Sequence, residues 1–191
     1  MARFRAAVKR VFDIGVAAAL IALTAPLWGL AAVAILAQDG GPVFFRHTRV
    51  GRGGRRFGMW KFRSMVRDAA TRGGYQTVRG DPRITPVGRL LRRTSIDELP
   101  QLLNVVCGDM SLVGPRPDTP AQEANYATED WALRCTVRPG ITGLAQVAAK
   151  TSATPQDRAA LDLRYVREQS LALDLRIMGR TAMAVLRLKN R

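Results

Sequence analysis

Two adjacent carboxylates, Asp97 and Glu98, lie in the stretch TSIDELPQLLNV (residues 94–105), although the chain as a whole is strongly basic. Mg²⁺ favours sites with one or two carboxylates, where phosphates and waters supply the other ligands. A carboxylate can also attack phosphorus and form an acyl-phosphate. Phosphoryl transfer further needs cations that neutralise charge. The chain supplies them just upstream, as Arg89, Arg92 and Arg93.

A purely structural interpretation of the same stretch is a helix cap. Ser95 with Glu98 three residues later has the pattern of a capping box. With Ser95 as the cap, Pro100 would fall beyond the first turn, where proline disrupts helical hydrogen bonding. Asp97 as the cap keeps Pro100 within the first turn. Both versions place the carboxylates at a helix N-terminus, which also attracts phosphate.

A second phosphate-binding candidate is the Pro–Arg–Pro sequence at residues 115–117. Pro117 favours an extended conformation for Arg116, and Pro115 restricts how the chain enters the motif. An arginine held in this way is preorganised for a bidentate phosphate contact. A rigid loop with a solvated arginine explains the motif equally well when it is taken alone.

The composition indicates a folded protein with anionic partners. The chain has 191 residues, is 47% hydrophobic and carries 30 Lys and Arg against 15 Asp and Glu, a net charge of +15. This length allows one modest domain with a core. Such a charge suits phosphates, nucleic acid or an anionic membrane surface. With His47 as the single histidine and two distant cysteines, no zinc site can be built from His and Cys clusters.

An uncharged segment of 24 residues, 14–37, is long enough to cross a membrane. As a helix it would measure about 36 Å, against about 30 Å of bilayer hydrocarbon. Pro26 near its middle favours a kink or break. The flanks are basic on both sides, which a single span cannot reconcile with the positive-inside tendency. A spanning helix and a re-entrant pair of half-helices therefore both stay open.

The rest of the chain reads as an α+β, mainly helical fold. We expect a membrane segment at residues 1–39 and a catalytic domain at residues 40–191. PVFFRHTRV and RRFGMWKFRSM, joined by a glycine-rich turn, predict a short β-hairpin. Residues 155–191 read as mostly amphipathic helix, suited to a membrane interface or to a homodimer.

Taken in order, these motifs resemble one known family. GPVFFRHTRVG, KFRSM, GDPRITPVGRLLRRTSIDELPQLLNVVCGDMSLVGPRP and VRPGITGLAQV are similar to the bacterial sugar transferases, the monotopic polyprenyl-phosphate phosphoglycosyl transferases. The resemblance runs from about residue 7 to residue 188. It implies a re-entrant membrane helix broken at Pro26, amphipathic interfacial helices, and a catalytic domain on the cytoplasmic face of the inner membrane. Ala25 stands where many members have Ser.

The resemblance also implies a reaction and a set of site residues. Sugar-1-phosphate would pass from a UDP-sugar to polyprenyl (undecaprenyl) phosphate through a covalent phosphosugar on Asp97, with UMP released and Mg²⁺ required. This would be the first membrane step of glycoconjugate biosynthesis, for example of an exopolysaccharide. Glu98 would orient the metal or activate the lipid phosphate, and Asp97 and Glu98 would be the metal ligands. The implied substrate- and phosphate-binding residues are Lys61, Arg63, Arg92, Arg116, Arg138, Asp162 and Tyr165.

Two other classes of protein compete with this interpretation. A membrane-tethered, basic binding protein for nucleic acid is compatible with the net charge. Against it, the chain has no recognisable binding module and few aromatic residues, so we expect no nucleic-acid partner. A catalytically silent scaffold would keep the fold, but the intact Asp97–Glu98 pair argues against it. The shared motifs leave the donor sugar open.

Overall fold

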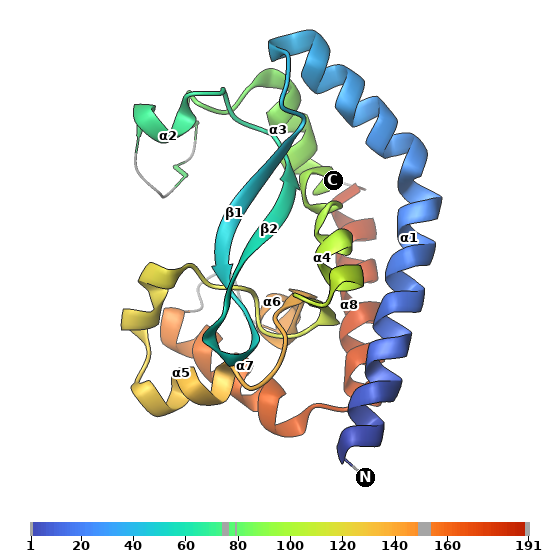
Figure 1. Cartoon of the computed structure of the whole chain (residues 1–191), viewed down its shortest axis with the longest axis vertical. Helices are drawn as coiled ribbons and strands as arrows, with labels where there is room; N and C mark the ends of the chain where they lie inside the picture. Colours follow the sequence, from blue (N-terminus) through green and yellow to red (C-terminus); the bar gives the residue numbers. More distant parts are fainter. Residues whose placement is uncertain (1, 74–76, 79, 149–153, 190–191) are drawn as a thin grey trace.

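The computed structural model describes residues 2–73, 77–78, 80–148 and 154–189. They form a mainly helical α+β fold in which short strands are surrounded by helices (Figure 1). The α-helices and strands, in chain order, are α1 (Ala2–Asp39), β1 (Phe44–Val50), β2 (Arg56–Phe62), α2 (Ala69–Arg72), α3 (Pro86–Arg93), α4 (Gln101–Cys107), β3 (Ser111–Val113), α5 (Thr128–Arg134), β4 (Gly140–Thr142), α6 (Leu144–Ala148), α7 (Pro155–Glu168) and α8 (Leu171–Lys189). Single 3₁₀ segments are η1 (Arg52–Gly54), η2 (Ile96–Glu98) and η3 (Pro120–Asn125).

The predicted β-hairpin is confirmed. Strands β1 and β2 pair antiparallel, with Phe45 opposite Lys61 and His47 opposite Met59. The connection passes through Gly53, whose φ of 68° lies in the left-handed region that suits glycine. Because side chains alternate across a strand, Lys61 and its partner Phe45 lie on the same face of the hairpin.

Helix α4 lies between the hairpin and α1 and forms the centre of the core (Figure 1). Its buried Leu102 and Val105 belong to one hydrophobic cluster with residues of α1, β3, α7 and α8. Asn104 ties the helix to β2, since its amide group accepts from the Trp60 N–H at 2.9 Å and donates to the Gly58 carbonyl at 2.9 Å. These two hydrogen bonds fix α4, and with it the preceding turn that carries Asp97 and Glu98, relative to β2.

A parallel pair of short strands, β3 and β4, positions the Pro–Arg–Pro motif. Ser111 pairs with Gly140 and Val113 with Thr142. A side chain on Gly140 would collide with the backbone of Gly114, so this close approach requires glycine. The chain leaves the pair at Gly114 and enters the Pro–Arg–Pro motif immediately.

Helix α1 differs from the predicted helix-break-helix, because it is one helix of 38 residues with Pro26 inside it. In Figure 1 the helix is bent rather than divided. Proline removes one backbone donor, and bending can absorb this loss. Side chains nearby engage each other and the backbone: the Thr24 hydroxyl donates to the Leu20 carbonyl at 2.7 Å, and the Trp28 indole donates to Thr24 at 3.1 Å. They supply polar contacts although Ala25 has no hydroxyl.

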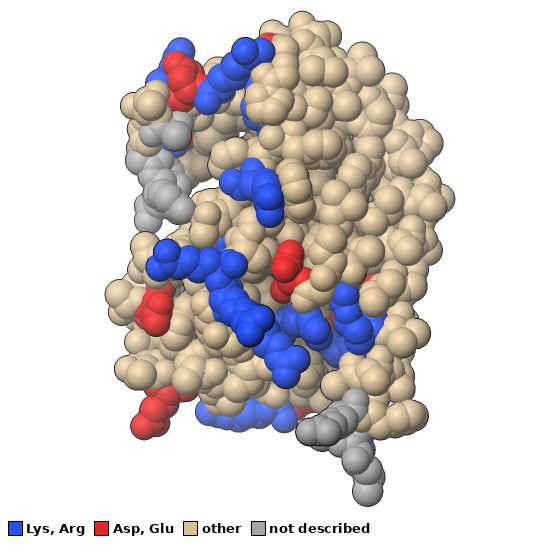
Figure 2. Space-filling view, viewed as in Figure 1, with Lys and Arg blue, Asp and Glu red and all other residues tan. Residues whose placement is uncertain are grey.

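One side of α1 is apolar and exposed, and the other side packs on the rest of the fold. Within the described residues, α1 is the helix long and apolar enough to cross a membrane, by length and composition alone. Figure 2 shows that the outer edge formed by α1 is nearly free of charge, whereas Lys and Arg gather over the hairpin side. Exposed apolar residues on α1 are Phe4, Val8, Val11, Leu20, Leu23, Leu27, Leu30, Val33 and Leu36.

Both halves of α1 contact the same domain. In the first half, Lys9 forms an ion pair with Asp174 at 2.7 Å, and Asp13 accepts from the Ser111 hydroxyl at 2.7 Å. In the second half, buried Ala31 and Ile35 pack in the cluster that contains Phe62 and Leu91. The rest of the fold therefore lies along one side of the apolar helix.

The C-terminal region is helical, as predicted, but it is divided into α7 and α8 around residues 169–170. Residues 190 and 191 lie outside the described part. Helix α8 lies beside the N-terminal half of α1 (Figure 1). It exposes Leu171, Leu175 and Met183, while Asp174 and Ile177 are buried. Apolar side chains therefore lie on its exposed side as well as on its buried side.

Candidate active site

The two carboxylates lie in the 3₁₀ turn η2, between α3 and α4. Neither predicted cap forms: Ser95 makes no capping bond with its side chain, and the residue before α4 is Pro100. Ser95 adopts a left-handed conformation with φ 57°, and its carbonyl accepts from the Glu98 N–H at 3.2 Å. Backbone groups thus close the turn, so the carboxylate side chains are available for other contacts.

Glu98 brings together two of the predicted cations. Its Oε1 accepts from Lys61 Nζ at 2.7 Å and from Arg116 Nη2 at 2.9 Å. Burial alone would raise the pKa of Glu98, but Arg116 and Lys61 outweigh it and lower the pKa to about 2. Glu98 is therefore ionised at neutral pH and links β2, η2 and the Pro–Arg–Pro motif.

Asp97 lies beside this cluster and is 6% exposed. Burial raises its pKa; Lys61 opposes the rise, the Glu98 charge adds to it, and Arg92 opposes it. Arg92 is held in place by a hydrogen bond from its Nε to the Ser64 hydroxyl at 2.8 Å. A desolvated carboxylate with raised pKa and nearby cations has the properties of a nucleophile toward an anionic phosphate.

The two carboxylates fit a magnesium ion that takes its other ligands from phosphates and water. Among the described residues there is no group of three His, Cys, Asp or Glu side chains that could hold a metal alone. Mg²⁺ does not require one, because phosphate-bound Mg²⁺ commonly uses one or two carboxylates. Both hydrogen bonds to Glu98 use Oε1. Within the described chain, its Oε2 accepts none.

Two predicted phosphate-binding residues are not placed at the carboxylate pair. Arg63 donates to the carbonyls of Asp39 and Gly40, at the C-terminal end of α1. Arg138 donates from Nε to the Gly108 carbonyl at 2.8 Å, at the C-terminal end of α4. Since Asp97 precedes α4, Arg138 is separated from it by about 10 Å of helix. Both arginines cap helix ends.

Asp162 and Tyr165 lie on α7 and also contact protein groups. Asp162 is paired with the buried Arg134 at 3.2 Å, and burial raises the pKa of Asp162 to about 6 against the opposing effect of Arg134. Tyr165 is fully buried, and its hydroxyl donates to either the Val113 carbonyl at 2.9 Å or Asp174 Oδ1 at 2.7 Å. Neither residue contacts Asp97 or Glu98.

We predict that Tyr165→Phe destabilises the protein without affecting turnover per folded molecule. The substitution removes the hydroxyl that lies between two buried acceptors, which costs about 1–3 kcal/mol. Thermal unfolding would measure the loss, and turnover normalised to folded protein would stay within about twofold. A large loss of turnover in folded Tyr165→Phe would instead indicate a direct part in the reaction.

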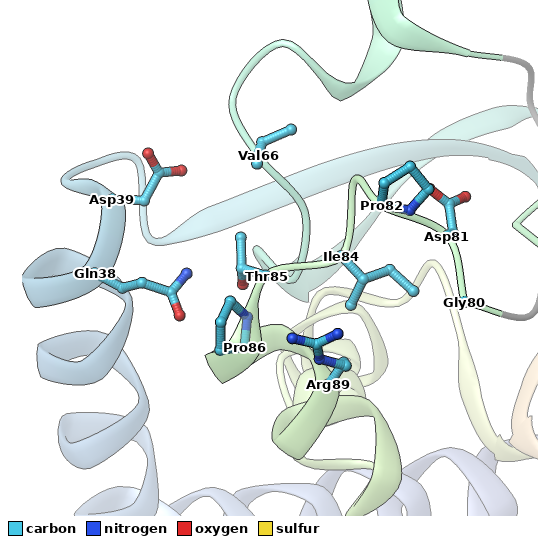
Figure 3. A pocket seen from close by; sticks show the side chains of 10 residues that line it. All are labelled: Gln38, Asp39, Val66, Gly80, Asp81, Pro82, Ile84, Thr85, Pro86 and Arg89. Atoms are coloured by element: carbon cyan, nitrogen blue, oxygen red, sulfur yellow. The ribbon is translucent and has the colours of Figure 1, made fainter.

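A surface cavity lies away from the carboxylate pair Asp97 and Glu98. It measures about 380 Å³ and lies between the end of α1 and the start of α3 (Figure 3). Asp97 and Glu98 do not line it. Its lining is Gln38, Asp39, Val66, Gly80, Asp81, Pro82, Ile84, Thr85, Pro86 and Arg89. Charge arrangement, rather than this cavity, marks the candidate active site, because Lys61, Arg92 and Arg116 surround the adjacent carboxylates.

Some residues that support the site had little signal in the sequence. Ser64 orients Arg92, Arg49 donates to the Pro117 carbonyl at 3.0 Å, and Arg134 contacts the carbonyl of Arg116. Arg49 and Ser64 lie within quoted motifs, but nothing in their spacing indicates these partners. Arg134 lies outside those motifs, and only its burial in the fold reveals its contacts.

The fold thus combines a long apolar helix with a buried carboxylate, Asp97, beside Glu98 and several cations. The model of the family described as bacterial sugar transferase matches residues 4–188. The chain belongs to this family and is a transferase.

Curated relatives agree with this assignment. The chain is 47% identical to a UDP-glucose:undecaprenyl-phosphate glucose-1-phosphate transferase of Caulobacter vibrioides, over 95% of this chain and 71% of that protein. It is 40% identical to an undecaprenyl-phosphate galactose phosphotransferase of Salmonella typhimurium, over 94% of this chain but only 40% of that protein. It is 40% identical to the exopolysaccharide production protein PSS of Rhizobium leguminosarum, over 93% and 94% of the two chains.

Proposed function

We propose that the protein transfers a sugar-1-phosphate from a UDP-sugar to undecaprenyl phosphate in the cytoplasmic membrane. The observation that carries the proposal is the buried Asp97 next to Glu98, whose Oε1 holds Lys61 and Arg116. The names of the relatives support the donor and acceptor classes. They differ in the sugar, glucose in one and galactose in the other, so the donor sugar stays open.

In the first step a carboxylate oxygen of Asp97 attacks the phosphorus that carries the sugar. A new bond forms between this oxygen and phosphorus, while the bond from phosphorus to the bridging oxygen breaks. That oxygen leaves with its electron pair as part of UMP. Lys61, Arg92 and Arg116 neutralise charge on the phosphates during the displacement.

In the second step an oxygen of the lipid phosphate attacks the same phosphorus. The bond to Asp97 breaks, the carboxylate is regenerated, and the sugar is left on a lipid diphosphate. No proton has to be removed from an ionised lipid phosphate. Glu98 therefore serves by orienting Lys61 and Arg116 and by offering Oε2 to a cation.

Asp97 and Glu98 would hold Mg²⁺ jointly with the donor phosphates. When bound, the ion would neutralise charge on the phosphates and on the leaving group. The unused Oε2 of Glu98 and the shortage of further acidic ligands nearby support a site completed by substrate.

A one-sided membrane attachment fits this acceptor. Lys9 and Asp13 in the first half of α1 and Ala31 and Ile35 in the second half contact the same domain. A helix crossing the bilayer perpendicular to its plane would draw that polar domain into hydrocarbon, at high cost. We therefore propose that α1 enters and leaves on the cytoplasmic face, with its exposed apolar side in lipid.

Nucleotide release tests the proposal. Full-length protein in nanodiscs would be mixed with Mg²⁺, undecaprenyl phosphate and a panel of UDP-sugars. Release of UMP with one sugar would support sugar-1-phosphate transfer and identify the donor. Release of UDP would mean ordinary glycosyl transfer and would overturn the mechanism. Folded protein that releases neither nucleotide across the panel would favour a scaffold role.

We predict that Lys61→Met moves the acidic limb of the pH–rate profile to higher pH. Asp97 must be ionised to attack, so the rate falls as pH falls through its pKa. Lys61 is the strongest of the charges that lower this pKa, and its loss raises it. The profile of UMP release between pH 4 and 9 would show the shift. Lys9→Met, remote from Asp97, tests whether losing another half-buried, ion-paired lysine has the same effect.

A further inference from the structure

Arg134, on α5, is a buried cation with an unusually complete set of partners. It is 5% exposed, and its guanidinium pairs with Asp118 at 3.0 Å and with Asp162 at 3.2 Å. The same group lies against the rings of Tyr126 and Trp131, at 5.4 and 5.7 Å. Few buried groups are held from so many directions, so its position is well defined.

Nη2 of Arg134, the atom that forms both ion pairs, also donates to the main-chain carbonyl of Arg116. The side chain of Arg116 in turn donates to Glu98. The three neighbouring carbonyls are also engaged. Pro115 accepts from the Gly140 N–H at 2.9 Å, Pro117 from Arg49 at 3.0 Å, and Asp118 from the Val50 N–H at 2.9 Å. Four consecutive carbonyls of this loop are therefore fixed, and Arg134 holds the one that belongs to the active-site arginine.

The Arg116 side chain itself is 47% exposed and long. An exposed arginine loses much rotamer freedom when it forms one ion pair, so such pairs form weakly unless the backbone is already placed. Fixing the carbonyl of Arg116 limits the directions from which its guanidinium can approach Glu98. This is the preorganisation that phosphate recognition needs.

The carboxylates around Arg134 fit a positioning role. Two carboxylates surround one guanidinium, and Oδ1 of Asp162 is buried without a hydrogen-bond partner among the described residues. Burial also raises the pKa of Asp162 to about 6, so holding its charge in this place is unfavourable. The negative charge of Asp162 attracts the Arg134 guanidinium and so keeps it in this orientation.

We propose that Arg134 is a positioning residue that sets Arg116 on Glu98, and that Asp162 and Asp118 act through Arg134 rather than on substrate. The kcat/KM measurements that test this proposal rest on the proposed function. In this proposal Asp162 orients the side chain of Arg134, whereas the family resemblance implied that Asp162 contacts the substrate.

A double-mutant cycle tests it. In the full chain in nanodiscs, Arg134→Gln is expected to lower kcat/KM about 10- to 100-fold, with folding checked by thermal unfolding. If Arg134 acts through Arg116, then Arg134→Gln should cost little in a chain that already carries Arg116→Gln. Losses that multiply in the double variant would overturn the proposal.

Asp162→Asn provides the same cycle if Arg134→Gln fails to fold. It keeps the shape of the side chain and removes a charge that burial disfavours. Folded Asp162→Asn should lower kcat/KM in the wild-type background but not on top of Arg116→Gln. The matched control is Arg164→Gln on the same helix, whose exposed ion pair with Glu168 should be dispensable.

Hydrogen exchange separates this proposal from the proposed function. Amide exchange at Gly140 and Val50, whose N–H groups donate to the carbonyls of Pro115 and Asp118, should accelerate in Arg134→Gln and Asp162→Asn, whatever reaction the protein catalyses. Arg116→Gln should leave this exchange unchanged, since it keeps all four carbonyl contacts. Unchanged exchange in folded Arg134→Gln would overturn the positioning role even if UMP release were established.

Discussion

Asp97→Asn is expected to lower turnover by about 10⁴-fold or more, because it removes the nucleophile itself. The folded state should be no less stable than the wild type. Burial raises the pKa of Asp97, so an ionised Asp97 is a charge that its surroundings in the folded chain disfavour. The neutral amide has nearly the same shape and carries no such penalty.

The pH dependence of stability follows from the same shift. The folded chain keeps its proton on Asp97 to higher pH than the unfolded chain, whose pKa is near the ordinary 3.8. Unfolding therefore releases a proton above this value, and the contribution of Asp97 to stability decreases as pH rises through the folded pKa. The Asn variant should lack this decrease.

Two measurements check the prediction. Wild-type protein given donor without acceptor should release up to one equivalent of UMP and gain the mass of a sugar phosphate, whereas Asp97→Asn should do neither. Asp68→Asn, in an exposed ion pair with Arg72, is the matched control and should behave as wild type. Retained turnover in Asp97→Asn would mean direct transfer without a covalent intermediate.

Local sequence signals predicted the parts of the fold that depend on local interactions. The hairpin follows from two β-prone runs and a glycine turn, and Gly53 does adopt the left-handed conformation. Residues 155–191 are predicted to be mostly helical, and α7 and α8 lie within them. These signals act within a few residues, so they can be interpreted without knowing which distant parts of the chain pack against these segments.

The cap prediction failed because a distant constraint determined the local structure. Ser95 or Asp97 could each cap a helix by spacing, yet η2 closes through backbone bonds and α4 starts only after Pro100. Asn104 fixes α4 against β2, which sets where the turn must lie. No pattern within TSIDELPQLLNV reports that contact.

The continuous α1 and the placement of Asp162 have the same explanation. Pro26 predicts disruption, but Thr24 and Trp28 supply polar contacts around it, and contacts with the domain at both ends hold the helix. For Asp162 and Tyr165, spacing places both on one helical face, but α5 and β3 determine what that face meets. Both partners lie far away in sequence.

Glu98→Gln is expected to lower turnover by about 10²–10³-fold, since Glu98 organises two cations and offers an oxygen to the metal. It should also move the acidic limb of the pH–rate profile to lower pH. The Glu98 charge contributes to the raised pKa of Asp97, so removing it lowers that pKa. Lys61→Met shifts the limb in the opposite direction, which a general loss of folding cannot produce.

Magnesium dependence then distinguishes the two roles of Glu98. If Oε2 is a metal ligand, Glu98→Gln should raise the Mg²⁺ concentration needed for half-maximal rate, and Mn²⁺ binding in the presence of UMP should weaken in parallel. If Glu98 only orients Lys61 and Arg116, metal affinity should be unchanged while kcat falls. An acidic limb that moves to higher pH in Glu98→Gln would contradict the direct effect of the Glu98 charge on Asp97, and would mean that displacement of Lys61 outweighs it.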